Sequence, residues 1–422
     1  MNHAQADMLA AREHLARSGW ITRKTEAFRH LLPPPAELWL GDAAAAQPEA
    51  PPLELAGWTL QPTGHTLHTH TSAEWLDAAD AAQRHALFAG LPLPDAAAGD
   101  DAAPFAWAHR ALCRQGLRLR VEPTTGAPAP TESTWLTLQY QPRAPIEAPL
   151  AVIEIGAGVN AVLVETHGHA TPGTRDWQLV QNLQLHVRLG AGASLTHLRV
   201  VEPHDDDQLA HHVHVKLARG AQYRQALIGE GSRYHLQRLL FDLEAEDASA
   251  SVGTVLTASG MALDFQSYVR HLAPRTTSAV QALALARDRA QVVLNTHAHI
   301  AAGCDDANVH QLLTGIPVHG EPRLTLRPHM EILHDQVQAT HGATWGALPE
   351  DALFYAQQRG IANQVARGLI VRGMASDLLT RAIDDDALSE QLNAAGRLTR
   401  AIARLLEEED TAAPAASGAE HG

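Results

Sequence analysis

The chain has 422 residues, enough for roughly two or three domains by the usual length prior, and it carries a formal net charge of −15. A chain this acidic binds the phosphate backbone poorly, so nucleic acid is not expected as a partner. Its only two cysteines, Cys113 and Cys304, exclude a disulfide scaffold and a four-thiolate metal site held by this chain alone. Because it has neither a run of 18 apolar residues nor an apolar signal core, we expect a cytoplasmic protein that does not associate with a membrane.

Three stretches rich in Ala, Pro and Asp interrupt the first third of the chain. They cover residues 41–52, 91–104 and 123–131, and their composition is typical of surface loops or connectors. Residues 3–18, in contrast, form an Ala-rich segment that predicts a short helix. We therefore expect residues 1–149 to form an N-terminal, mostly helical region with loops.

From residue 150 the hydrophobic pattern has a period of two. Residues 183–189, 212–217 and 292–300 alternate between apolar and polar side chains, with Thr296 on the apolar side of the last segment. A period of two is typical of strands that have one buried face and one wet face. The pattern therefore predicts a mainly β region over residues 150–344.

Small turn pairs separate these expected strands. They begin at Gly192, Gly220, Asp247 and Arg289, at intervals of 28, 27 and 42 residues, which are close to multiples of 14. A repeat of this length favours strands that coil around a common axis, as in a β-helix or solenoid. An ordinary β-sandwich is the alternative, since it also contains many short strands.

After residue 345 the period becomes helical. Pro349 predicts the start of one helix and Gly360 follows its end, and an apolar stripe over residues 365–370 predicts a second helix. Apolar residues from Leu388 to Leu405, spaced by three or four, predict a third, long helix. We expect residues 345–409 to form a C-terminal helical domain and residues 410–422 a disordered tail.

Histidine is abundant, with 26 residues in the chain. The pairs His212/His214 and His297/His299 each place two imidazoles on one strand face, and His65, His68 and His70 cluster near the N-terminus. Two imidazoles can chelate zinc or iron, but we favour polar, solvent-exposed faces because no third ligand is fixed by the spacing. We interpret Asp205–Asp207 as a solvated loop for the same reason, although an acidic cluster can bind a divalent cation.

The chain lacks the Walker nucleotide loop, the GxSxG nucleophile elbow and the HExxH zinc motif. Two alternatives of other classes nevertheless remain open at this point. One is a carbohydrate-active β-helix enzyme similar to a polysaccharide lyase, with a cleft formed by Asp205–Asp207 and outward-facing Arg188 and Arg199. The other is a histidine-rich metal-storage protein, which would bind several ions tightly in isolation.

The stretch over residues 327–373 carries a family resemblance. Its ordered elements are Pro328-x-Met-Glu-Ile332, His341-Gly-Ala-Thr-x-Gly346 and Leu353-Phe-Tyr-x-x-x-Arg-Gly-Ile361. These elements resemble the C-terminal part of the SufB/SufD family, most closely SufD, which are scaffold proteins of the Suf iron–sulfur cluster assembly machinery. Residues 22–28 resemble the N-terminal element of the same family.

The resemblance implies a fold and a set of partners. The fold is a mainly β protein with a central right-handed parallel β-helix flanked by N-terminal and C-terminal helical regions. The partners are the paralogue SufB, which pairs edge to edge with the end of the β-helix, and the ATPase SufC, which docks on the C-terminal helices. The chain itself would be a non-enzymatic scaffold subunit, and a homodimer in the absence of SufB is left open.

The resemblance also implies functional residues. His341 matches a histidine that faces the SufB junction, where a transient iron–sulfur cluster or iron is shared between the two subunits. Its neighbours in the junction motif are Thr340, Gly342, Ala343 and Thr344. The residues expected to dock the ATPase are Phe354, Tyr355, Arg359, Gly360 and Ile361.

One departure from the family pattern limits what this subunit can supply. Some relatives carry a cysteine two residues before the junction histidine, whereas this chain has Ala339. Any ligand that this subunit contributes to the junction must therefore be the imidazole of His341, and the isolated chain is expected to bind no cofactor tightly. A flavin is associated with the assembled complex in this family, but the sequence does not indicate where it would bind. We interpret Cys113 and Cys304 as small buried residues.

Overall fold

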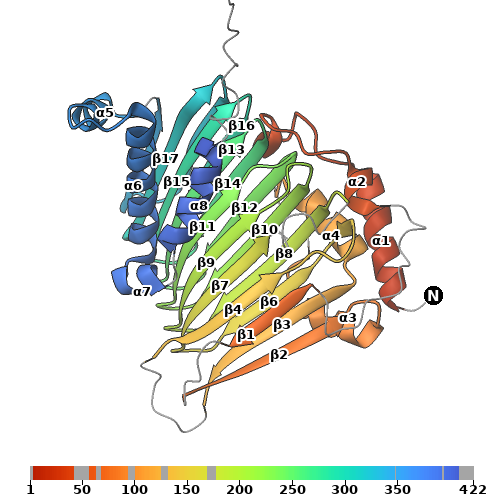
Figure 1. Ribbon diagram of the computed structural model, residues 1–422. Coiled ribbons are helices and arrows are strands. Elements are labelled where there is room, and N and C mark those ends of the chain that lie inside the picture. Colours follow the sequence, from red (N-terminus) through yellow and green to blue (C-terminus); the bar gives the residue numbers. More distant parts are fainter. Residues whose placement is uncertain are drawn as a thin grey trace, which may run out of the picture.

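The computed structural model describes residues 3–41, 57–62, 68–93, 100–124, 132–168, 177–346, 348–391 and 394–407. His65, the tail over residues 410–422 and parts of the three expected loop stretches lie outside these ranges. Two long sheets form the body of the molecule, and the N-terminal and C-terminal helices lie on opposite sides of it (Figure 1). No helix among the described residues is long and apolar enough to cross a membrane.

The strands form two sheets that run the length of the body. Sheet A has the order β1-β4-β7-β9-β11-β13-β15-β17-β19, and sheet B has the order β18-β16-β14-β12-β10-β8-β6-β3-β2. The strand bounds are β1 Trp58–Pro62, β2 Thr69–Asp77, β3 Gln115–Pro123, β4 Thr134–Tyr140, β5 Ile146–Glu147, β6 Leu150–Ile155, β7 Asn160–Gly168, β8 Val180–Leu189, β9 Ser194–Glu202, β10 Gln208–Leu217, β11 Gln222–Glu230, β12 Tyr234–Leu243, β13 Ser249–Ser259, β14 Ala262–His271, β15 Thr277–Asp288, β16 Gln291–Ile300, β17 Ala307–Gly320, β18 Arg323–Ile332 and β19 Val337–Trp345.

Consecutive strands alternate between the two sheets, so the chain coils as a parallel β-solenoid. Seven described coils run from β6 with β7 to β18 with β19, and neighbouring coils pair in parallel. Gln208 of β10 pairs with Val180 of β8 and with Tyr234 of β12. The coil from β8 to β10 therefore takes 28 residues, and the next coil, from β10 to β12, takes 26. The prediction of a mainly β fold with a β-helix core is confirmed, and the β-sandwich alternative is wrong.

The turns form two columns on opposite edges of the solenoid. One column holds left-handed residues at Gly192, Gly220 and Asp247, and the other holds Asp288 in the same conformation. Arg289-Ala290 therefore belongs to the second column, which explains why its interval of 42 residues is one and a half coils. A left-handed turn residue recurs because each coil must reverse sharply between the two sheets.

The apolar face of each strand points into the solenoid. Leu185, Val213 and Leu294 belong to one continuous buried cluster between the two sheets, and Thr296 is also buried, as the alternation predicted. The outer face of each sheet is covered over part of its length. The N-terminal segments pack on sheet B around Phe105, and the C-terminal helices pack on sheet A around Val371 and Leu398.

The helical regions differ in part from the sequence expectation. Their bounds are α1 His3–Ser18, α2 Ala36–Leu40, α3 Ala81–Phe88, α4 Ala103–Leu112, α5 Glu350–Gln357, α6 Asn363–Ile383, α7 Asp386–Gln391 and α8 Ala394–Glu407. The region over residues 1–149 also contains β1 to β5, and β3 and β4 already pair in parallel with the solenoid strands β6 and β7. The described residues of the predicted third helix are helical and belong to α7 and α8.

The two ends of the solenoid are built differently. At the N-terminal end β1 pairs antiparallel with β4, and β2 pairs antiparallel with β3, so chain reversal covers the first coil. At the C-terminal end β18 and β19 are the last strands of their sheets and pair only with β16 and β17 among the described strands. We call this C-terminal end, formed by β18 and β19, the open end.

Candidate functional site

His341 lies on β19, the last strand of sheet A, and its side chain is exposed. It is the register partner of Gln311 on β17, which is buried inside the solenoid. Residues of the same parity on these strands, Val309 and Ala339, pack into the apolar cluster of the last coil. The imidazole of His341 therefore stands at the open end, where the interior of a further coil would begin.

The neighbours of His341 fix the backbone of β19. Thr340 points to the other face, where its hydroxyl lies 2.9 Å from Nδ1 of His310. A Cβ atom on Gly342 would lie 3.3 Å from a methyl group of Leu312, so the close approach of the two strands favours glycine there. Ala343 and Thr344 are exposed and continue the strand. The residues expected at the junction thus lie on an edge strand rather than in a loop.

Exposed apolar side chains accompany this edge. Ile332 ends β18 and Leu333 follows it, and Trp345 ends β19 with 67% of its surface exposed. Parallel strands at the end of a sheet also leave backbone N–H and C=O groups without a ladder partner. Unpaired edges together with exposed apolar groups are typical of a surface that pairs with another polypeptide.

A second apolar surface lies on the C-terminal helices. Phe354 and Tyr355 on α5 are 63% and 60% exposed, and Val365 and Leu369 on α6 are also exposed. The Arg359 guanidinium lies 3.3 Å from the Tyr355 ring centroid, which fixes the aromatic side chain in place.

The backbone after α5 turns sharply towards α6. Gly360 adopts a left-handed φ of 77°, and the N–H of Ile361 donates to the carbonyl of Ala356 at 3.2 Å. The expected docking residues Phe354, Tyr355, Arg359, Gly360 and Ile361 therefore lie on one helix–turn unit.

Both cysteines are buried, as predicted. Cys113 is fully buried, and burial raises the pKa of its thiol to about 12. The Cys304 thiol lies 3.2 Å from the carbonyl oxygen of His271, and burial raises its pKa as well. Neither thiol is poised as a thiolate ligand, because a raised pKa keeps the proton on sulfur.

A polar network crosses the interior of the solenoid. The sequence analysis did not predict this network. The Glu165 carboxylate lies 3.1 Å from Arg199 Nε and 2.7 Å from His197 Nε2, and it also contacts His167. Burial opposes ionisation of Glu165, but Arg199 and the histidines outweigh it and hold its pKa well below its usual range. Arg199 Nη2 lies 3.0 Å from His211 Nδ1, so the network continues to sheet B.

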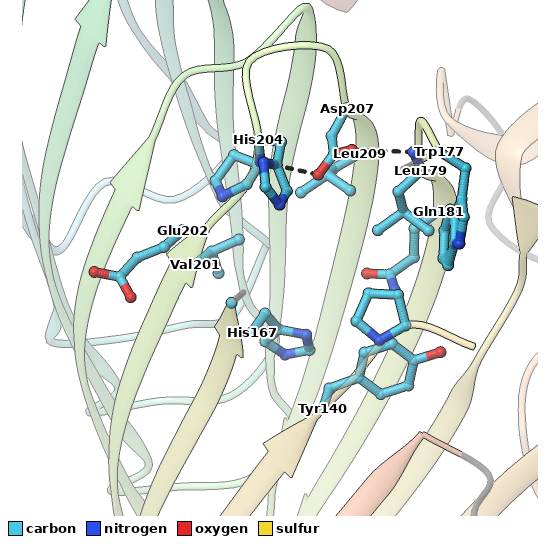
Figure 2. Close-up of a pocket in the computed structure, with 13 residues that line it drawn as sticks. Tyr140, His167, Trp177, Leu179, Gln181, Val201, Glu202, His204, Asp207 and Leu209 are labelled. Atoms are coloured by element: carbon cyan, nitrogen blue, oxygen red, sulfur yellow. Dashed lines mark hydrogen bonds between the residues drawn. The ribbon is translucent and has the colours of Figure 1, made fainter. Parts of the chain in front are cut away.

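A cavity of about 130 Å³ opens beside this network, where β7 and β9 end and β8 and β10 begin. Figure 2 shows His167 and Tyr140 on one side of it and Asp207 on the other. Asp207 is buried and accepts hydrogen bonds from the backbone N–H of Leu179 at 3.0 Å and of His204 at 2.9 Å. It therefore fixes the loop instead of facing a substrate.

These positions correct two expectations. Arg199 points into the core and not outward, and Asp207 is a buried structural residue and not part of a solvated loop. Two of the residues expected in a polysaccharide-lyase cleft, Arg199 and Asp207, are therefore unavailable to a substrate, whereas Asp205 and Asp206 are exposed as expected. The period of two correctly predicted which side chains share a face of the strand. It did not predict which of the two faces would be covered by the rest of the protein.

The histidine faces are less exposed than the sequence indicated. His212 is buried under α4 against Phe105, with ring centroids 5.2 Å apart. His214 is half-buried, and its Nε2 lies 2.8 Å from Asp242. His297 and His299 keep about a third of their side-chain surface exposed, and His70 is exposed, in line with the expectation.

Comparison with known proteins agrees with this architecture. Residues 141–374 match the protein-family model described as SUF system FeS cluster assembly, SufBD core domain. The chain belongs to the SufBD family. The matched range covers the solenoid, the open end and the first part of the C-terminal helices.

Individual SufBD relatives match over shorter stretches. An iron–sulfur cluster assembly SufBD family protein of Synechocystis is 26% identical over 241 residues, which are 54% of this chain and 51% of that protein. The iron–sulfur cluster assembly protein SufD of Escherichia coli is 38% identical over 66 residues, 16% of this chain and 15% of SufD. SufB of Bacillus subtilis is 24% identical over 144 residues, 34% of this chain and 31% of SufB. The chain thus spans about half the length of the cyanobacterial relative and less of the other two.

Proposed function

We propose that this SufBD family protein is a SufD-type, non-enzymatic scaffold subunit that works in the cytoplasm. Its open end would pair with a SufB-type partner, and its C-terminal helices would dock a SufC-type ATPase. The observation that carries the proposal is the asymmetry of the solenoid. One end is covered by antiparallel strands, and at the other end β18 and β19 each have one edge without a partner among the described strands, beside exposed Trp345 and His341.

The ligands that we propose at the junction follow from the side chains that this chain can offer to iron. Both cysteines are buried with raised thiol pKa values, and Ala339 stands where some relatives have cysteine. The partner would therefore supply the thiolates, and His341 would offer a neutral imidazole to iron or to a nascent cluster, as histidine does in mixed sites. The cluster is the cargo of the complex and not a resident cofactor of the isolated chain.

The ligand role is tested by His341→Ala in the complete three-protein complex. We expect the complex to assemble at normal yield while its iron content and its cluster formation fall. If both stay unchanged, the ligand role of His341 is wrong, although the scaffold role survives. A chain that fails to copurify with SufB-type and SufC-type proteins of the same cell would overturn the scaffold role itself.

The docking surface is tested separately. Arg359→Glu inverts a charge next to a helix end and removes the cation stacked on Tyr355, so ATPase retention in a pull-down should fall. Leu93→Ser is a suitable control, because Leu93 is 61% exposed but lies on the N-terminal side of the molecule. ATPase recovery at the unmodified yield with Arg359→Glu would contradict the assignment of docking to α5.

A further inference from the structure

Four polar side chains form a rectangular array on the outer face of sheet B. His297 and His299 lie two residues apart on β16, and His329 and Glu331 are their register partners on β18. The intervening residues Ala298 and Ile300 are buried in the core, so the four alternate positions face outward. Outward side chains on a strand are about 7 Å apart and neighbouring strands about 4.8 Å apart, so the four head groups share one small patch of the surface.

The contacts within the array already converge on one oxygen. Oε2 of Glu331 lies 2.9 Å from Nδ1 of His299 and 3.9 Å from Nε2 of His297. The rings of His297 and His329 stack with their centroids 6.3 Å apart. Ligand atoms around a tetrahedral ion with bonds of about 2.0–2.1 Å are roughly 3.3 Å apart, a value between the two measured distances.

The three proposed ligands are accessible to solvent. His297, His299 and Glu331 have 31%, 28% and 54% of their side-chain surface exposed, so an ion in solvent can reach them.

The array is not preassembled as a coordination shell. Within the part of the chain that the structure describes, no three His, Cys, Asp or Glu side chains surround a common point as metal ligands do. In the structure the His299 imidazole and the Glu331 carboxylate are instead hydrogen-bonded to each other. An ion can replace that bond after small rotations of exposed side chains, which surface positions allow without moving the backbone.

We propose that His297, His299 and Glu331 bind a divalent transition-metal ion, with His329 or water completing the coordination. Two imidazoles and one carboxylate suit Zn²⁺, Co²⁺ or Fe²⁺, whereas Mg²⁺ and Ca²⁺ prefer oxygen ligands alone. The site goes beyond the proposed function, because it needs neither partner and faces outward from sheet B, whereas His341 faces the interior side of sheet A. It also revises the expectation that the isolated chain binds no metal tightly.

The test is titration of the metal-free full-length chain with Co²⁺, whose visible absorption reports imidazole and carboxylate coordination, and with Zn²⁺ by calorimetry. We expect one site above the background of other histidines. His299→Ala and Glu331→Ala should each weaken that site by about tenfold or more, since even loss of a residue outside the coordination shell costs 10–100-fold. His85→Ala is the matched control, because this exposed histidine lies on α3, and it should leave the site unchanged.

Two results would overturn the proposal. One is Co²⁺ binding that is equally tight in wild type, His299→Ala and Glu331→Ala, which would indicate general binding by surface histidines. The other is Mg²⁺ competition at concentrations equal to those of Co²⁺, which would exclude the proposed ligand class. Circular dichroism on each variant verifies that it is folded, and copurification with the partners reports separately on the proposed function.

Discussion

Glu165 and Arg199 form an ion pair that is completely buried inside the solenoid. Their side chains are 0% exposed, and Arg199 also reaches Gln237 at 2.5 Å and His211 at 3.0 Å. Removing two charges from water is costly, and mutual attraction offsets that cost only while both partners are present. Loss of either Glu165 or Arg199 should therefore lower the stability of the solenoid interior.

Replacement of one partner should show this sensitivity. We expect Arg199→Met to reduce the free energy of unfolding by about 3–5 kcal/mol, because it leaves the Glu165 carboxylate buried without its cation. The measurement is the urea unfolding midpoint followed by circular dichroism. The double variant Glu165→Gln/Arg199→Met should recover much of the loss, since it removes both charges. A single variant as stable as wild type would show that the histidines alone balance Glu165.

The buried pair also marks the limit of what could be predicted at the residue scale. The alternation correctly predicted that Leu185 and Val213 face the core, because apolar side chains there need no further partner. It failed for Arg199, because a charged residue is expected to face water unless a distant partner is known. Glu165 is 34 positions earlier, and only the coiling of the chain brings it to Arg199.

At the scale of elements, helix α6 depends on one glycine of sheet A. Gly253 on β13 lies directly under the helix, so a Cβ atom there would be 2.6 Å from Cβ of Ala382 and 3.0 Å from the carbonyl oxygen of Leu378. Both neighbours are held by the helix backbone and cannot move away alone. The helix can pack this closely only because residue 253 has no side chain.

We therefore expect Gly253→Ala to loosen α6 from the solenoid and lower its resistance to limited proteolysis, while the solenoid core remains protected. Gly373→Ala, within α6, is the matched control: a Cβ there meets nothing within 4 Å, so alanine should stabilise the helix by roughly 0.5–1 kcal/mol. Cleavage patterns from a short protease digest compare the two. Equal protection of α6 in both variants would contradict the close-packing argument.

The elements themselves were largely predictable. Residues 3–18 form α1, Pro349 and Gly360 bracket α5, and the turn pairs lie at coil corners, since caps and left-handed turn residues act locally. The strands before residue 150 could not be recognised in the same way. β3 and β4 are stabilised by pairing with β6 and β7, and that pairing has no local signal between the loop-rich stretches.

At the scale of the whole molecule, the solenoid buries many neutral histidines. Burial lowers the pKa values of seven of them: His109 and His212 to about 3, His235 and His271 to about 4, His186 and His211 well below the usual range, and His167 below it. In the unfolded chain the same imidazoles gain a proton near pH 6.5. Between the folded and unfolded pKa values the unfolded state binds more protons, so stability falls as the pH is lowered through that window.

Buried carboxyl groups change the pH dependence of the stability in the opposite direction. Burial raises the pKa values of Asp264 and Glu230 to about 7 and also raises that of Glu147. These groups hold a proton in the folded state that the unfolded state has lost, so their contribution to stability grows as the pH falls towards their unfolded values near 4. These three groups are outnumbered by seven histidines among the described residues. The carboxylates Glu165 and Asp242, whose pKa values are lowered, also lose stabilisation as the pH falls, so the net effect has the sign of the histidines.

We therefore expect the melting temperature to fall steadily as the pH decreases from 6.5 to about 4, because each buried histidine contributes up to about 1.4 kcal/mol per pH unit in that range. Thermal unfolding at fixed ionic strength between pH 7.5 and 4.5 measures the effect. His212→Asn should make the slope shallower, because it removes one proton uptake site while its position stays under α4. A melting temperature that is constant or rises towards pH 4.5 would mean that the buried carboxyl groups outweigh the histidines. In that case the interior of the solenoid would gain stability from acid.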